Sequence, residues 1–247
     1  MIDGTTGELV VFDTRELVAA ALADRFVKDA QAAIAQRGTF FVALAGGSTP
    51  RASYQLLAQE PRRSQVDWNR VQVFFGDERC VTPDSDESNY KMAADAFLRA
   101  VDIPETNVHR IHGEDEPARA AADYAAELIA SMGNPPRFDL IMLGMGTDGH
   151  TASLFPGADP QTDEDRLVRA VYVEKLHAFR ITLTPLVINN ARHVVIASEG
   201  LAKAPALYAV LRGPREPSVH PIQVVAPAQG RLTWYVDRAA AAELTPK

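Results

Sequence analysis

Four short apolar runs constrain the fold of this chain more than any other feature. They cover residues 40–45, 71–75, 138–143 and 193–197. Each run is almost continuously apolar and has the length of a strand, which is typical of parallel strands that are buried on both faces. A shorter apolar run at 9–12 is expected to form the first strand. These runs predict a largely parallel sheet inside the protein.

Helical patterns separate the predicted strands. Val18, Leu22, Phe26, Ala30 and Ile34 recur at steps of four residues and predict an amphipathic helix that ends near residue 38. Further helices are expected at 50–59, 89–100, 118–131 and 201–211. Strands that alternate with helices predict an α/β fold, in which a mostly parallel twisted sheet carries helices on both faces. The chain contains no internal repeat or flexible linker, so one domain is predicted for 1–247.

The composition excludes several classes of protein. With 25 basic and 32 acidic residues the net charge is −7, so no basic face for nucleic acid is expected. No apolar run approaches the roughly 20 residues of a membrane span, and no secretory signal is recognisable at the start. Cys80 is the single cysteine, so the chain cannot form an internal disulfide. We expect a cytoplasmic protein without membrane or nucleic-acid partners.

Ligands of such a sheet bind at the carboxyl ends of the strands, so the residues that follow each apolar run are the candidates for chemistry. The first such loop contains Gly46, Gly47, Ser48 and Thr49, followed by Pro50. The glycines allow close approach of a ligand, Ser48 or Thr49 can cap the next helix, and the free N–H groups at its start favour an anion. An ordinary turn with a capped helix explains the same residues equally well.

The second loop places Asp77, Glu78 and Arg79 directly after a buried strand. Three charges at that place are costly unless they face a ligand or pair with one another. A ligand site and an internal Asp77–Arg79 ion pair are therefore the two alternatives. We expect the thiol of Cys80 to be small and partly buried rather than nucleophilic.

The third loop contains His150 within a glycine-rich turn. Residues 144–149 match the dinucleotide-binding pattern G-x-G-x-x-G, and Asp163 even has the spacing of the acidic partner. Pro156, however, follows too closely for the long helix that this motif opens, so no nucleotide cofactor is expected. Because neutral imidazole accepts a proton near pH 7, His150 is a candidate general base, which Asp148 can orient.

Two further cations complete the candidate site. Arg180 begins an alternating, strand-like run, and Lys203 lies in the first turn of a predicted helix. A cation at that end opposes the helix dipole, which indicates that Lys203 meets an anion. Solvated surface charge is the alternative for both. His109 and His112 lack an accompanying carboxylate motif, so no metal site is predicted.

These motifs together resemble the 6-phosphogluconolactonase family over residues 9–238. The resemblance is carried by Gly46-Gly47-Ser48-Thr49-Pro50, Gly76-Asp77-Glu78-Arg79 with Ser88-Asn89-Tyr90, the long segment 143–156 around His150, Arg180-Ile181-Thr182, and Gly200 with Lys203. Of these motifs, the long segment around His150 is very specific for the family, whereas the short arginine and lysine motifs are not. Where many members carry a Lys-Pro-Pro segment, this chain has Lys175-Leu176-His177, which leaves the conformation of that loop and the role of Lys175 open.

The resemblance implies hydrolysis of 6-phospho-D-glucono-1,5-lactone to 6-phospho-D-gluconate in the oxidative pentose phosphate pathway. It implies that His150 is the general base, with Asp148 beside it. It also implies that the phosphate-binding site is formed by Arg79, Lys203 and the Ser48–Thr49 turn. Gly46, Gly47, Asp77 and Arg180 are expected to complete the substrate site. The resemblance implies neither a cofactor nor a metal, and we expect a monomer or a small homo-oligomer.

Two other functions remain possible from the sequence. Glucosamine-6-phosphate deaminases share part of these motifs, but they have Asp-Glu-Tyr in place of Asp77-Glu78-Arg79 and a catalytic glutamate in place of Phe155. The third hypothesis is a sugar-phosphate-binding module without activity. Related transcription regulators carry a DNA-binding part, for which the roughly eight residues before the first predicted strand leave no room.

Overall fold

The computed structural model describes residues 7–157 and 165–244. Its strands are β1 (Glu8–Phe12), β2 (Phe40–Leu44), β3 (Val71–Phe75), β4 (Asp77–Arg79), β5 (Leu140–Gly144), β6 (Val168–Val173), β7 (Ala178–Leu183), β8 (His193–Ser198) and β9 (Arg231–Asp237). Its α-helices are α1 (Arg15–Arg37), α2 (Ser48–Leu57), α3 (Asn89–Ala93), α4 (Pro117–Met132), α5 (Pro185–Ile188) and α6 (Ala204–Arg212). No helix in these ranges is long and apolar enough to cross a membrane.

Six strands form the main sheet in the order β1-β9-β8-β5-β2-β3. Every neighbouring pair in it is parallel, which confirms the predicted mostly parallel sheet. Strand β9 was not expected, because its sequence RLTWYVD mixes charged and polar residues with apolar ones. Six of its seven residues are nevertheless buried between β1 and β8.

A second, antiparallel sheet in the order β4-β7-β6 continues from the first. Gly76 alone separates β3 from β4, and its carbonyl oxygen accepts a hydrogen bond of 2.9 Å from Leu183. The chain thus passes directly from one sheet into the other. The sequence did not predict this sheet, because β4 is three charged residues long and carries no apolar alternation.

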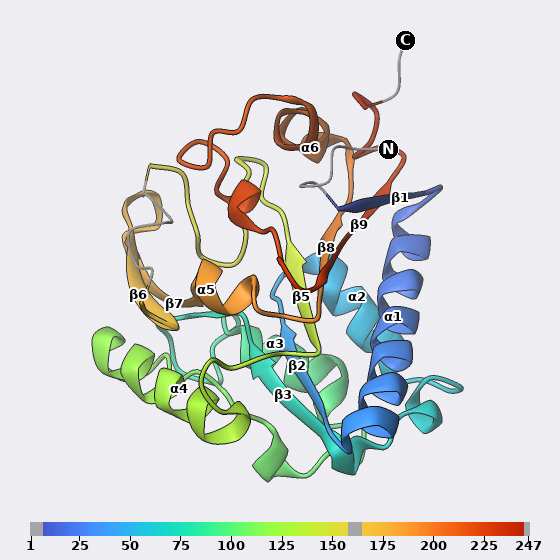
Figure 1. The fold of residues 1–247 in the computed structure, drawn as a ribbon, viewed down its shortest axis with the longest axis vertical. Coiled ribbons are helices and arrows are strands. Elements are labelled where there is room, and N and C mark those ends of the chain that lie inside the picture. The colour runs from blue at the N-terminus through green and yellow to red at the C-terminus, as the bar shows by residue number, and fades with distance from the viewer. Residues whose placement is uncertain (1–6, 158–164, 245–247) are drawn as a thin grey trace.

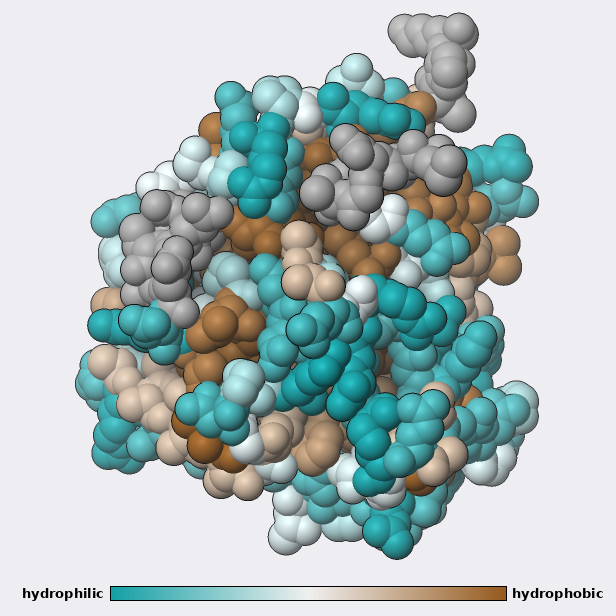
Figure 2. All heavy atoms as spheres, viewed as in Figure 1, coloured by the Kyte–Doolittle hydropathy of each residue, from teal (hydrophilic) through white to brown (hydrophobic). Residues whose placement is uncertain are grey.

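Helices lie on both sides of the main sheet, as predicted. In Figure 1, α1 and α2 lie on one side, while α5 and the small sheet lie on the other. Phe26 of α1 packs on Phe40 of β2, with 5.2 Å between the ring centroids, and Trp68 and Phe97 join the same cluster. Figure 2 shows mainly hydrophilic residues on the outer face in the same view, with hydrophobic ones between them.

The predicted helix at 89–100 differs in detail from the observed one. The α-helical part ends at Ala93, and a π-helical turn continues it over Ala94–Leu98. Ser88 caps its start by accepting a hydrogen bond of 3.1 Å from the backbone N–H of Lys91. The wider turn holds Phe97 inside the aromatic cluster.

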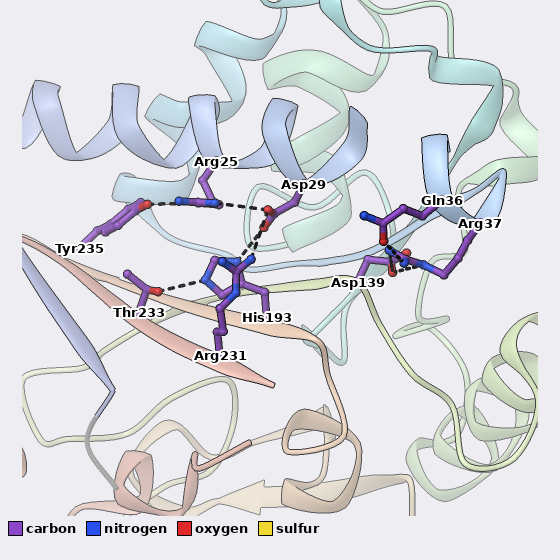
Figure 3. A network of polar contacts seen from close by, with 9 residues as sticks. All are labelled: Arg25, Asp29, Gln36, Arg37, Asp139, His193, Arg231, Thr233 and Tyr235. Atoms are coloured by element: carbon purple, nitrogen blue, oxygen red, sulfur yellow. Dashed lines mark hydrogen bonds and ion pairs between the residues drawn. The ribbon is translucent and has the colours of Figure 1, made fainter. Parts of the chain in front are cut away.

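A buried polar network ties α1 to the main sheet (Figure 3). Asp29 of α1 lies 2.7 Å from Nδ1 of His193, which starts β8, and the other ring nitrogen of His193 is 3.0 Å from Oγ1 of Thr233 in β9. Arg25 bridges Asp29 and the Tyr235 hydroxyl. Because each of these buried polar groups has a partner, the network fixes the position of the helix on the sheet without a large desolvation cost.

Replacing Asp29 with alanine is expected to lower the free energy of unfolding by about 3 kcal/mol, because it leaves the buried His193 without its acceptor. Urea unfolding measures this. Asp24→Ala is the matched control on the same helix: its carboxylate is 65% exposed and pairs with Arg62, so the loss is expected to stay below about 1 kcal/mol. Equal losses in the two variants would contradict a stabilising role of the network.

Candidate active site

A cavity of about 290 Å³ opens at the carboxyl ends of the central strands. Its lining includes Gly46, Gly47, Ser48, Thr49, Asp77, Arg79, His150, Arg180 and Lys203. These residues come from loops that are far apart in the sequence, and the parallel sheet brings them to one edge. Asp148 does not line the cavity but contacts His150 from behind. The structure thus brings together all the residues that the sequence predicted for the site.

His150 is held by the tight turn that follows β5. The N–H of Gly146 donates a hydrogen bond of 2.8 Å to the carbonyl oxygen of His150, and Gly149 has the left-handed φ of 76° that such a turn needs. A Cβ atom on Gly146 would overlap the imidazole ring and press on Asp148. Glycine at this position is therefore required by the packing of the histidine, not by a dinucleotide.

Asp148 fixes the imidazole. Its Oδ1 lies 2.5 Å from Nδ1 of His150, and its Oδ2 accepts a hydrogen bond from Lys175. Burial would raise the pKa of Asp148, but the hydrogen bonds from Lys175 and His150 outweigh burial and hold that pKa well below its usual value. The ionised carboxylate can only accept, so Nδ1 of His150 carries a proton and Nε2 is left as the acceptor.

Phe155 packs against the imidazole ring of His150. The centroids of the two rings are 4.5 Å apart, and the ammonium of Lys175 lies 4.8 Å from the centre of the Phe155 ring on its way to Asp148. Lys175 comes from the short turn Glu174–Leu176 between β6 and β7. This loop, whose role the sequence left open, thus reaches the histidine through Asp148.

Arg79 and Arg180 stand directly opposite each other on β4 and β7. Burial lowers the pKa of Arg180, and the Arg79 guanidinium lowers it further, against the opposing effect of nearby carboxylates. Arg79 donates to the carbonyl oxygen of Glu87, yet within the described residues the buried Nε atoms of both arginines have no hydrogen-bond partner. Like charges opposite each other in a sheet repel, and a bound anion would offset the repulsion between the two guanidinium groups.

Asp77 does not pair with Arg79 in the way that the alternative interpretation expected. Its Oδ2 accepts a hydrogen bond of 2.7 Å from Ser153, and its Oδ1 lies 3.2 Å from the side-chain nitrogen of Asn89. The Asn89 amide in turn packs so closely on Gly46 that a Cβ atom there would overlap it. Asp77 therefore holds together three loops of the cavity.

Glu78, for which the sequence suggested no separate role, anchors the arginine loop. The residue is 2% exposed, and its carboxylate accepts hydrogen bonds of 2.8 Å from the backbone N–H groups of Arg79, Asn89 and Tyr90. Burial raises the pKa of Glu78, and these backbone hydrogen bonds oppose that rise. Ser88 adds a further hydrogen bond at 3.0 Å. The carboxylate thus positions the backbone from which Arg79 extends.

Helix α2 starts at the cavity wall without a side-chain cap. Gly47, with a φ of 102°, is the N-cap residue, and Ser48 is the first residue of the helix. The predicted cap by Ser48 or Thr49 was therefore wrong: the Ser48 hydroxyl lies 3.4 Å from Glu199, and Thr49 is buried. Because no side chain caps the helix, its first N–H groups are available to an anion in the cavity.

Lys203 reaches the cavity from the short turn Leu201–Lys203 that precedes α6. Burial lowers its pKa, and the carboxylates of Asp148 and Glu199 oppose that effect. Glu199 and Ser198, which also line the cavity, were not singled out from the sequence. Ser198 is the last residue of β8 and Glu199 follows it, so their position at the carboxyl end of a buried strand was the signal that would have identified them.

The arrangement suits a small phosphorylated ester. Three cations and an open helix start can hold an anion, and the imidazole in the same cavity, when neutral, can take a proton from water. Among residues 7–157 and 165–244, no three His, Cys, Asp or Glu side chains lie close enough together to hold a metal ion.

Comparison with known proteins agrees with this geometry. Residues 13–234 match the family model described as glucosamine-6-phosphate isomerases/6-phosphogluconolactonase. A 6-phosphogluconolactonase of Nostoc is 39% identical over 241 residues, which cover 96% of this chain and 97% of the relative. The structure named 6-phosphogluconolactonase from Trypanosoma cruzi is 29% identical with a TM-score of 0.87, and the match covers 99% of each chain.

A monomeric glucosamine-6-phosphate deaminase shares the fold alone. It is 18% identical with a TM-score of 0.82, and the match covers 96% of this chain and 99% of that one. Together, the family match and the extent of the similarity to the Nostoc relative leave one classification. The chain belongs to the family of glucosamine-6-phosphate isomerases and 6-phosphogluconolactonases.

Proposed function

We propose that this protein hydrolyses 6-phospho-D-glucono-1,5-lactone to 6-phospho-D-gluconate, with His150 as the general base. The observation that carries the proposal is the His150–Asp148 pair in a cavity that also holds Arg79, Arg180 and Lys203. Relatives named 6-phosphogluconolactonase match almost the whole chain. The single cysteine supports a reducing, cytoplasmic setting.

In the proposed mechanism, Nε2 of His150 takes a proton from water as its oxygen attacks the lactone carbonyl carbon. Asp148 keeps the proton on Nδ1 and stabilises the imidazolium that forms. When the tetrahedral intermediate collapses, the bond to the ring oxygen breaks and that oxygen receives the proton from His150. The ring opens to the free acid, which ionises. Because a lactone is already an activated ester, this route needs no covalent nucleophile, metal or cofactor.

The phosphate of the substrate is proposed to sit between Arg79, Arg180, Lys203 and the start of α2 with Gly47, Ser48 and Thr49. The unpartnered Nε atoms of the two arginines support this placement, because guanidinium groups pair well with phosphate. Asp77 and Gly46 are proposed to shape the site rather than to react, since the Asp77 carboxylate is bound by Ser153 and Asn89.

Phe155 favours hydrolysis over the deaminase reaction. An isomerisation with ring opening uses a carboxylate where this chain presents an aromatic ring 4.5 Å from the imidazole centroid. A direct assay separates the two functions. Freshly prepared lactone is followed through NADPH formation by added 6-phosphogluconate dehydrogenase, with spontaneous hydrolysis subtracted, and glucosamine-6-phosphate is tested for ammonia release. Ammonia release without lactonase activity would overturn the proposal.

Replacing His150 with alanine is expected to lower kcat by roughly 10²–10⁴ while substrate binding persists, because the proton acceptor is lost but the cations remain. The same coupled assay measures it. His112→Ala is the control, since that side chain is 53% exposed and lies outside the cavity. An unchanged kcat for His150→Ala would remove His150 from the mechanism.

Replacing Arg180 with glutamine is expected to raise KM about tenfold or more, the value of one charged hydrogen bond. The melting temperature is expected to stay the same or rise, because the variant removes the repulsion from Arg79 across the strand pair. Lys203→Ala is expected to raise KM similarly. If either variant leaves KM unchanged while kcat collapses, the phosphate assignment fails.

Replacing Lys175 with methionine is expected to raise the pKa of Asp148, because the hydrogen bond that lowers it is lost. A carboxyl with a depressed pKa contributes stability above its unfolded pKa and loses it as the pH falls through the folded value. In the variant this loss of stability shifts to higher pH. Carbon NMR of the carboxyl groups follows the titration. Lys91→Met, whose hydrogen-bond partners are Asp86 and Asp95, is the control. An unaltered Asp148 titration would contradict the contact.

A further inference from the structure

A second cavity lies at the opposite, amino-terminal edge of the main sheet. It has a volume of about 400 Å³ and shares no lining residue with the candidate active site. Four arginines line it, Arg37, Arg137, Arg192 and Arg231, together with the two carboxylates of Asp29 and Asp139. Arg37 ends α1, while the other arginines lie just before or at the starts of β5, β8 and β9.

The two carboxylates are already occupied by partners. Asp139 is 5% exposed; it accepts a hydrogen bond of 3.1 Å from Nε of Arg37 and another of 2.9 Å from the backbone N–H of Phe41. Asp29 holds His193 and Arg25, and the nearest nitrogen of Arg231 is 3.9 Å away (Figure 3). Four guanidinium groups thus face two carboxylates in a chain whose net charge is −7, so positive charge is in local excess.

Two of the arginines, Arg137 and Arg192, have a buried Nε that makes no hydrogen bond within the described residues. Arg137 donates one hydrogen bond of 3.0 Å to the carbonyl oxygen of Gln229, but within the described residues its buried Nε has no partner. Nε of Arg192 is 3.3 Å from Asp139, without the geometry of a hydrogen bond. Burial lowers the pKa of Arg192, and Arg37 and Arg137 lower it further. Buried N–H donors without partners, placed beside other positive charges, are unfavourable unless an anion accepts their hydrogen bonds and offsets the charge.

We propose that this cavity is a second binding site, for a small phosphate-bearing anion. The forked N–H groups of arginine pair with phosphate oxygens two at a time, and several of them converge here. A concave space of this volume suits a small molecule better than a protein surface. The proposal concerns residues outside the candidate active site and does not depend on the proposed lactonase function.

Calorimetric titration with pyrophosphate tests this site. Because the active site also holds cations, the titration uses the Arg180→Gln/Lys203→Ala double variant, in which that competing site is weakened. We expect one saturable site to remain. Adding Arg137→Gln is expected to weaken it about tenfold or more, whereas adding Arg137→Lys weakens it less. Arg119→Gln, an exposed arginine on α4 outside both cavities, is the control and leaves the affinity unchanged.

Folding is checked independently. Arg137→Gln in an otherwise unchanged chain is expected to keep its melting temperature and its lactonase activity, since Arg137 makes one hydrogen bond and lies outside the active-site cavity. Pyrophosphate is expected to raise the melting temperature of the unsubstituted chain more than that of Arg137→Gln. If the double variant does not fold, the unsubstituted chain is titrated, and Arg137→Gln must then remove one of two sites.

Three results would overturn the proposal. The first is the absence of a saturable site at millimolar pyrophosphate once the active site is weakened. The second is an equal affinity of Arg137→Gln and Arg119→Gln. The third is preference for another anion: tighter binding of citrate would assign the site to carboxylates, and tighter binding of a poly-glutamate peptide would make it a protein-docking surface.

Discussion

Burial of the six-stranded parallel sheet on both faces is the constraint on which the rest of this structure depends. Strands β2, β3, β5 and β8 are almost wholly apolar and nearly all of their residues are buried, which leaves little room on the faces of the sheet for reactive side chains. The polar groups that line the two cavities lie mainly where strands begin and end. The carboxyl edge carries His150 and its cations, and the amino edge carries the arginine cavity.

The small antiparallel sheet adds what a parallel sheet alone cannot provide. It places Arg79 opposite Arg180 and brings the Lys175 turn to Asp148. Two guanidinium groups held together in this way cost stability in the free protein. The buried carboxylate of Glu78 holds the loop in place through backbone hydrogen bonds. The proposed anion site would thus be assembled in advance, and a bound phosphate would offset the repulsion between Arg79 and Arg180.

Local sequence could indicate which side chains are candidates for the site, but not which residues each of them contacts. His150 and Asp148 are two residues apart, and their contact follows from the tight turn between them. The partners of Asp77, by contrast, are Ser153 and Asn89, which lie 76 and 12 residues away, and the sequence wrongly allowed a pair with Arg79. The cap of α2 was also misjudged, because Gly47 rather than a hydroxyl side chain occupies the N-cap position.

The sequence by itself determined five of the six parallel strands, the long helices, the position of the site at the strand ends and most of the residues that line it, although not Ser198 and Glu199. It could do so because buried runs and helical periodicity are local signals, and because chemistry must follow the strands. The tertiary structure alone decided the antiparallel sheet, strand β9, the role of Lys175 and the grouping of four arginines at the opposite edge. These depend on pairing between distant segments, and a local pattern such as the alternating run from Arg180 does not indicate which strand it pairs with.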